Sequence, residues 1–162
     1  LIMLEMADKF SDYQFVIAGA PCQDFEFYKP FIVTNNVKFI SNKTYDLLSI
    51  SYAALVTSGT ATLETALFKV PQVVCYKGST ISYQIAKRII TLKFISLVNL
   101  IMDREVVSEL IQDNFNVKRL EKELVKILEA KHRQKMFEDY YYLEQKLGGV
   151  GASENAAKLI VG

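Results

Sequence analysis

The chain has 162 residues, a hydrophobic fraction of 51%, a charged fraction of 23% and a formal net charge of +1. These values are ordinary for one globular domain with a sizeable core, and the small net charge gives no electrostatic reason to expect nucleic acid as a partner. With one histidine and two cysteines, the sequence predicts no zinc-type cluster, no disulfide framework and no cofactor. No apolar run is long enough to span a membrane, and we expect a cytoplasmic protein.

Short apolar segments alternate with amphipathic segments along most of the chain. The first ten residues already have the apolar spacing of a helix, so we expect a single domain, residues 1–162, excised from a longer protein. The predicted strands are residues 14–19, 37–40, 53–57, 72–76 and 94–98. The predicted helices are residues 24–32, 44–51, 60–69, 80–91, 104–112, 117–130, 133–147 and 152–161.

The predicted strands have little internal alternation of polar and apolar residues, which is typical of a parallel sheet covered by helices on both faces. We therefore predict an α/β fold with a doubly wound parallel sheet and extra C-terminal helices over residues 117–162. Such a sheet binds ligands outside the carboxyl ends of its strands. The glycines of residues 148–151 interrupt the last two helices, which either pack within one chain or exchange between the two chains of a homodimer.

The junction Ser58-Gly59-Thr60 joins a predicted strand to a predicted helix. The first N–H groups of a helix have no internal partners and the helix dipole is positive there, so a phosphate group fits this position. Glycine also lets a ligand approach the backbone closely. The alternative is that Ser58 is an ordinary N-cap and Gly59 a turn residue.

Glu64 follows Thr60 by one helical turn and is expected on the same helix face. A capping box that starts at Ser58 would use Ala61, so Glu64 is not explained as a capping residue. A carboxylate at this place can accept hydrogen bonds from the hydroxyl groups of a ribose. The alternative is an ordinary solvated charge. The junction matches neither the dinucleotide-binding nor the P-loop glycine pattern.

Residues 65–102 contain five basic residues and no acidic residue. Within this region the predicted helix 80–91 carries Ile81, Lys87 and Arg88 in a basic amphipathic pattern. This pattern suits a helix that lies on an anionic membrane surface. It equally suits an ordinary helix with one packed face and one solvated face.

Four segments occur in the order and spacing of one enzyme family: SGTATLE, VPQVVCYK, SYQIAKRI and FISLVNLIMDREVVSELIQ. The sequence resembles lipid-A-disaccharide synthases, which are glycosyltransferases with two Rossmann-like domains (the GT-B fold), over residues 37–130. The resemblance implies transfer of 2,3-diacylglucosamine from its UDP derivative to the 6-hydroxyl group of 2,3-diacylglucosamine 1-phosphate. The anomeric centre inverts, and the products are the lipid A disaccharide and UDP.

The resemblance also implies a set of substrate-binding residues: Ser58, Gly59, Thr60, Glu64, Asn99, Arg104 and Glu105. The first three would contact the diphosphate and Glu64 the ribose. Asn99, expected just past the strand 94–98, would lie near the sugar or the diphosphate. Arg104 and Glu105 would open the next helix, and Glu109 and Gln112 are weaker candidates.

The family's arginine-bearing glycine-rich loop and its proposed catalytic base would both precede residue 1, and Val98 replaces a usual proline. The resemblance therefore implies a half that binds the UDP-sugar donor and stabilises the departing UDP, with no catalytic residue of its own. Its partners would be the donor, a lipid acceptor and the cytoplasmic face of the inner membrane.

Two other functions stay open. A UDP-sugar epimerase-type domain would share the Ser-Gly-Thr junction, but we would not expect it to carry the segment from Asn99 to Gln112. A non-enzymatic nucleotide-binding or receiver domain is the other. A receiver needs acidic residues at its strand ends, where this sequence has Gly19 and Thr57.

Overall fold

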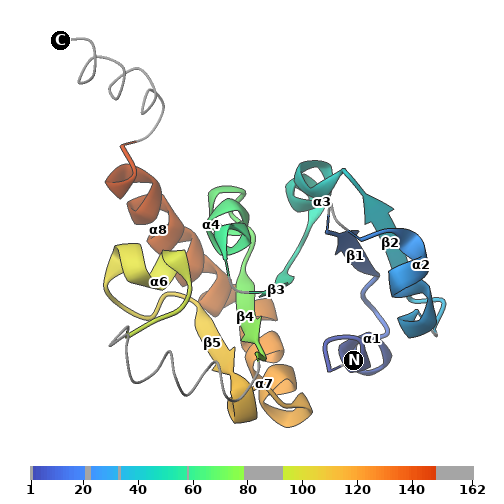
Figure 1. The fold of residues 1–162 in the computed structure, drawn as a ribbon. Coiled ribbons are helices and arrows are strands. Elements are labelled where there is room, and N and C mark those ends of the chain that lie inside the picture. The colour runs from blue at the N-terminus through green and yellow to red at the C-terminus, as the bar shows by residue number, and fades with distance from the viewer. Residues whose placement is uncertain (1, 21–22, 33, 58, 79–92, 149–162) are drawn as a thin grey trace, which may run out of the picture.

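Among the residues that it describes, a computed structural model of the chain has five strands in two parallel sheets (Figure 1). The structure describes residues 2–20, 23–32, 34–57, 59–78 and 93–148. In the first sheet β1 (Phe15–Gly19) pairs with β2 (Val37–Ser41). In the second sheet the order is β3 (Ala54–Thr57), β4 (Gln72–Tyr76) and β5 (Ser108–Ile111). The predicted helices 80–91 and 152–161 lie outside the described residues.

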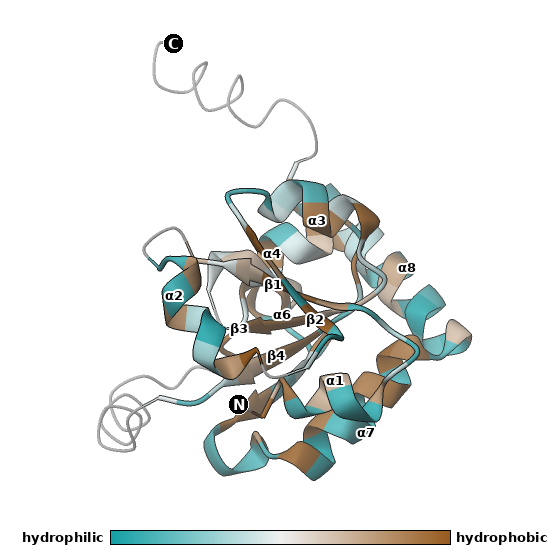
Figure 2. Cartoon of the chain, turned by 90° about the vertical axis from the view of Figure 1, so that its right-hand side faces the viewer, coloured by the Kyte–Doolittle hydropathy of each residue, from teal (hydrophilic) through white to brown (hydrophobic). Residues whose placement is uncertain are grey.

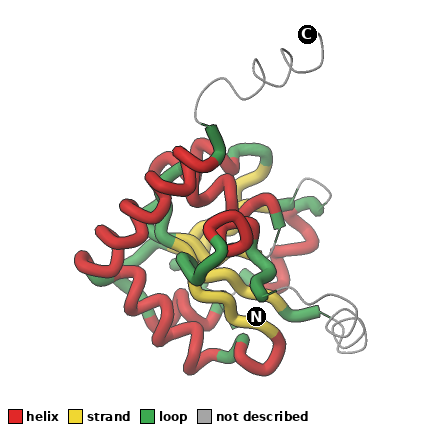
Figure 3. Tube along the Cα trace, turned by 90° about the vertical axis from the view of Figure 1, so that its left-hand side faces the viewer, coloured by secondary structure: helices red, strands yellow, loops and turns green. Residues whose placement is uncertain are grey.

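Helices surround the strands, as Figure 3 shows. Their bounds are α1 (Glu5–Lys9), α2 (Phe25–Tyr28), α3 (Thr44–Ile50), α4 (Thr60–Leu67), α6 (Leu97–Met102), α7 (Val117–Leu128) and α8 (Ala130–Lys146), with 3₁₀ turns η1 (Lys29–Phe31) and η2 (Gln112–Asn114). Parallel strands with helical connections confirm the predicted α/β, Rossmann-like class. The four predicted strands before residue 77 are also confirmed.

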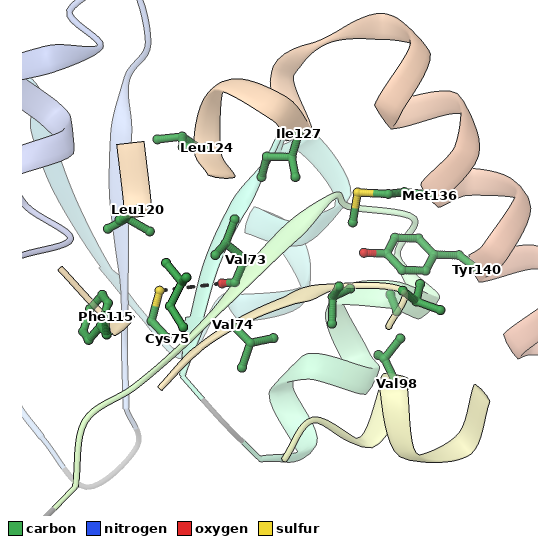
Figure 4. Close-up of a cluster of buried hydrophobic side chains, with 14 of the residues drawn as sticks. Val73, Val74, Cys75, Val98, Phe115, Leu120, Leu124, Ile127, Met136 and Tyr140 are labelled. Atoms are coloured by element: carbon green, nitrogen blue, oxygen red, sulfur yellow. Dashed lines mark hydrogen bonds between the residues drawn. The ribbon is translucent and has the colours of Figure 1, made fainter. Parts of the chain in front are cut away.

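Strand β4 lies at the centre of the second sheet and is buried on both faces. Its first four residues, Gln72–Cys75, are at most 1% exposed. Val74 lies on the same side as Val98 of α6, whereas the apolar side chains of α7 cover the opposite side (Figure 4). Burial raises the pKa of the Cys75 thiol to about 12, so this thiol stays protonated and unreactive at neutral pH.

Helix α7 is amphipathic, and its apolar face packs against β4. Leu120, Leu124 and Ile127 are buried and recur at helical spacing, whereas Val125 is exposed on the other side. Figure 2 shows the same division as brown and teal on α7, beside strands that are mostly brown. Asn116 caps the start of this helix by accepting a hydrogen bond from the backbone N–H of Arg119.

Two predicted elements in the second half of the chain are wrong. Residues 94–98, predicted as a strand, form a bend followed by the start of α6. The side chain of Ser96 accepts a hydrogen bond from the backbone N–H of Asn99, which begins a helix at this point. Asn99 therefore lies inside α6 and does not follow a strand.

Residues 104–112, predicted as a helix, contain β5 instead. Val106, Val107 and Leu110 are buried, and their spacing fits a helix face as well as it fits a strand that enters a core. Pairing with β4 in parallel register decides between the two. Arg104 and Glu105 consequently lie in the loop before β5 and do not open a helix.

We expect Val74→Ala to destabilise the chain by about 2 kcal/mol, because it removes two buried methyl groups and leaves a cavity between β4 and α6. Val74 is 0% exposed. The matched control is Val125→Ala on α7, where the side chain is 44% exposed and the expected change is below about 0.5 kcal/mol. Urea denaturation measures both values, and equal losses would contradict the two-sided burial of β4.

Candidate functional site

The predicted junction lies between Thr57, the last residue of β3, and Thr60, the first residue of α4. Gly59 is the N-cap and has φ +133° and ψ −162°, a conformation that side-chain-bearing residues rarely adopt. A Cβ atom at this position would meet no atom within 4 Å. Glycine is thus required here by the backbone and not by lack of space. Ser58 lies outside the described residues.

On the inner face of α4, the threonine hydroxyl groups donate hydrogen bonds to backbone carbonyl groups at the start of the same helix. Thr62 Oγ1 donates to the carbonyl oxygen of Gly59 at 2.8 Å, and Thr65 Oγ1 donates to that of Ala61 at 2.7 Å. The buried amide of Gln72 donates to the carbonyl oxygen of Thr62 at 2.9 Å, which ties α4 to the first residue of β4. These bonds hold α4 in place from its inner side.

The outer face of the same helix start is open. Gly59 and Thr60 are exposed, and within the described part of the chain no side chain accepts a hydrogen bond from their N–H groups. Glu64 is half-buried one turn later, and its carboxylate has no ion-pair partner among the described residues. An uncapped helix start with a neighbouring hydroxyl group suits an anionic ligand such as a phosphate.

Asn99 has a different environment. Its side chain is fully buried, and its amide donates to the carbonyl oxygen of Val107 and to Glu109 Oε1, both at 2.8 Å. Its Oδ1 accepts from the N–H groups of Val106 at 2.7 Å and Val107 at 3.0 Å. All four hydrogen-bonding positions of the side chain are occupied inside the protein.

Glu109 completes this arrangement from β5. Besides the Asn99 amide, its carboxylate accepts hydrogen bonds from the N–H of Ile95 at 2.9 Å, the N–H of Ser96 at 3.0 Å and the hydroxyl group of Ser96 at 2.8 Å. We call Ser96, Asn99 and Glu109 the carboxylate cradle. Sequence reasoning ranked Glu109 low. The available signal was an acidic residue within an apolar segment, because such a residue needs partners when it is buried.

Arg104 and Glu105 lie away from the open helix start. They precede β5, toward the amino ends of the parallel strands, whereas Gly59 follows β3 at its carboxyl end. Arg104 pairs with the largely buried Asp139 of α8 at 2.5 Å, and this hydrogen bond raises the pKa of the Arg104 guanidinium. Glu105 is exposed. The structure therefore brings Gly59, Thr60 and Glu64 together in one place and Asn99 and Arg104 in others.

The remaining predicted residues, Ile81, Lys87 and Arg88, lie outside the described residues. Among the residues that the structure describes, no group of three or more His, Cys, Asp or Glu side chains could hold a metal ion.

Comparison with known proteins gives a consistent set of relatives. The family model described as lipid-A-disaccharide synthetase matches residues 2–160. The lipid-A-disaccharide synthase of Syntrophus aciditrophicus is 43% identical over 122 residues, which are 75% of this chain and 32% of that protein. The synthase of Geobacter sulfurreducens is 30% identical over 160 residues, 97% of this chain and 42% of that protein. The chain thus spans less than half the length of these relatives.

We expect Gly59→Ala to lower the free energy of unfolding by about 1 kcal/mol or more, because alanine cannot adopt the native φ of +133° without strain. Thr60→Ala is the matched control at the next, exposed position, and its expected effect is within about 0.5 kcal/mol. Chemical denaturation measures both. If Gly59→Ala had the same free energy of unfolding as the unaltered chain, the positive φ at residue 59 would not require glycine there.

Proposed function

Because the chain belongs to the lipid-A-disaccharide synthetase family, we propose that it is the donor-binding half of an inverting glycosyltransferase of lipid A biosynthesis. The enzyme would transfer 2,3-diacylglucosamine from its UDP derivative to 2,3-diacylglucosamine 1-phosphate, with release of UDP. The observation that carries the proposal is the open start of α4 at Gly59 and Thr60, at the carboxyl end of a parallel strand. Parallel α/β sheets bind their ligands at this edge.

In this proposal the diphosphate of the donor lies against Ser58, Gly59 and Thr60. The N–H groups and the positive end of the α4 dipole would stabilise the charge that develops on UDP as the bond to the sugar breaks. Since these groups are fixed before the reaction, they need little reorganisation when the charge appears. Glu64 would accept hydrogen bonds from the ribose hydroxyl groups and so orient the nucleoside.

The other predicted contacts carry less structural support. Contact of Asn99, Arg104 and Glu105 with the sugar or the diphosphate stays a prediction, and the first two already have partners within the chain. We propose no residue of this chain as the general base that deprotonates the acceptor hydroxyl. We accordingly expect the chain alone to bind the donor without transferring its sugar. An epimerase-type or non-enzymatic role has no support from the family comparison.

Titration of UDP into the chain, with ADP as the competing nucleotide, tests the proposal. We expect UDP to bind more tightly than ADP, and Glu64→Ala to weaken UDP binding by about tenfold, which is about 1.4 kcal/mol. Glu138→Ala, on the exposed face of α8, is the matched control and should leave the affinity unchanged.

The outcomes separate the two parts of the proposal. Equal affinity for UDP in the Glu64→Ala chain would remove the ribose role of Glu64 and keep the nucleotide site. The nucleotide assignment would be overturned if neither this chain nor a full-length relative bound UDP at millimolar concentration.

The proposal includes a peripheral contact with the cytoplasmic face of the inner membrane. Its support is the run of residues 65–102, with five basic residues and no acidic one. Among the described residues no helix is both long and apolar enough to cross a bilayer. A homodimer through the C-terminal helices also stays a prediction.

Co-sedimentation with lipid vesicles tests the membrane contact. We expect binding to anionic vesicles that falls by roughly tenfold or more in the double variant Lys87→Ala/Arg88→Ala, because each basic residue near such a surface contributes about 1 kcal/mol. The double variant Lys118→Ala/Arg119→Ala removes the same charge from an exposed part of α7 and should bind like the unaltered chain. Equal losses in both variants would show a general charge effect and contradict a specific surface.

A further inference from the structure

We propose that Glu109 is a positioning residue for the candidate nucleotide site, acting through the carboxylate cradle and α6; this inference rests on the function proposed above. Glu109 lies in β5 and not at the open helix start. Its carboxylate accepts four hydrogen bonds, which come from Ile95, Ser96 and Asn99. This partly buried carboxylate therefore holds other parts of the chain in place.

Glu109 fixes the start of α6. The backbone N–H groups of Ile95 and Ser96 point at its carboxylate, and the N-cap hydroxyl of Ser96 also donates to it. A negative charge at the positive end of a helix, bound by charge-assisted hydrogen bonds, fixes that end strongly. Asn99 then joins the middle of α6 to the backbone of Val106 and Val107. Helix α6 is thus held by Glu109 of β5 and by the two residues just before that strand.

Helix α6 in turn supports α4. The two helices pack against each other, and Val98 and Ala66 are both fully buried in the same core. The ends of both helices are also tied to α8. Lys69, just past α4, pairs with Glu144, and Lys146 donates to the carbonyl oxygen of Ile101 in α6. A shift of α6 therefore changes the support of α4, whose first residues form the candidate site.

The two helix starts make the contrast clear. The start of α6 is filled by a carboxylate from the protein itself, whereas the start of α4 has no capping side chain among the described residues. The internal anion keeps α6 rigid, so the open start of α4 is held at a defined position for an external anion. Loss of the Glu109 charge would remove the ionic acceptor of the Ile95 and Ser96 N–H groups and loosen the start of α6.

Glu109→Gln tests this role in the intact chain, because it keeps the size of the side chain while one carboxylate oxygen becomes an amide donor. We expect the backbone amide resonances of Gly59, Thr60 and Thr62 to shift in NMR spectra of the nucleotide-free chain. We also expect UDP affinity to fall by roughly three- to tenfold, the range of a coupling carried through packed elements. Glu138→Gln on α8 is the matched control and should change neither readout.

A merely structural role would lower the melting temperature of Glu109→Gln and leave the site unchanged. A folded Glu109→Gln chain with unshifted Gly59 and Thr60 resonances and unaltered UDP affinity would therefore overturn the inference. If Glu109→Gln fails to fold, Ser96→Ala removes one hydroxyl donor to the carboxylate and gives the same two readouts. Because the NMR readout needs no nucleotide, a chain that binds no UDP would overturn the proposed function, while the resonance shifts would still decide the coupling of Glu109 to α4.

Discussion

Burial of β4 on both faces is the constraint on which the rest of the structure depends. Gln72, Val73, Val74 and Cys75 are all buried, so helices must cover both sides of this strand. Helix α7 covers one side, and α4 and α6 cover the other. Since β3 and β5 pair with β4 in parallel, each connection must return along the sheet, and α4 provides the return from β3 to β4. The position of the Gly59 junction at the carboxyl end of β3 follows from this arrangement.

The sequence predicted the first half of the fold better than the second. Strands β1 to β4 are short apolar runs between turn signals, and local patterning decides such segments. The segment from Phe94 to Gln112 failed because its pattern is ambiguous. A run such as FISLVNL fits a buried strand or a buried helix, and the Ser96 cap and the pairing of β5 with β4 decide the outcome. Both are contacts that a periodicity argument does not contain.

The candidate site divides in the same way. The place of the open helix start could be predicted, because it depends on local features: a strand end, a glycine and a helix start at Thr60. The environment of Asn99 could not, because a polar residue in an apolar segment is equally consistent with a ligand contact and with an internal hydrogen-bond network. Only the positions of Val107 and Glu109, eight and ten residues further along, show that the network is internal.

The segment from Phe94 to Gln112, one of the four that carry the family resemblance, holds an internal hydrogen-bond network. Ser96, Asn99 and Glu109 all lie in this segment, and all three bond to one another. Each of these residues completes the hydrogen bonds of the other two, so a change at any one leaves a buried polar group unpaired. The exposed Gly59 and Thr60 face no such mutual requirement, and what they need is a backbone held at one position. In the proposed function the internal network supports the backbone, and the open helix start uses that support to meet the ligand.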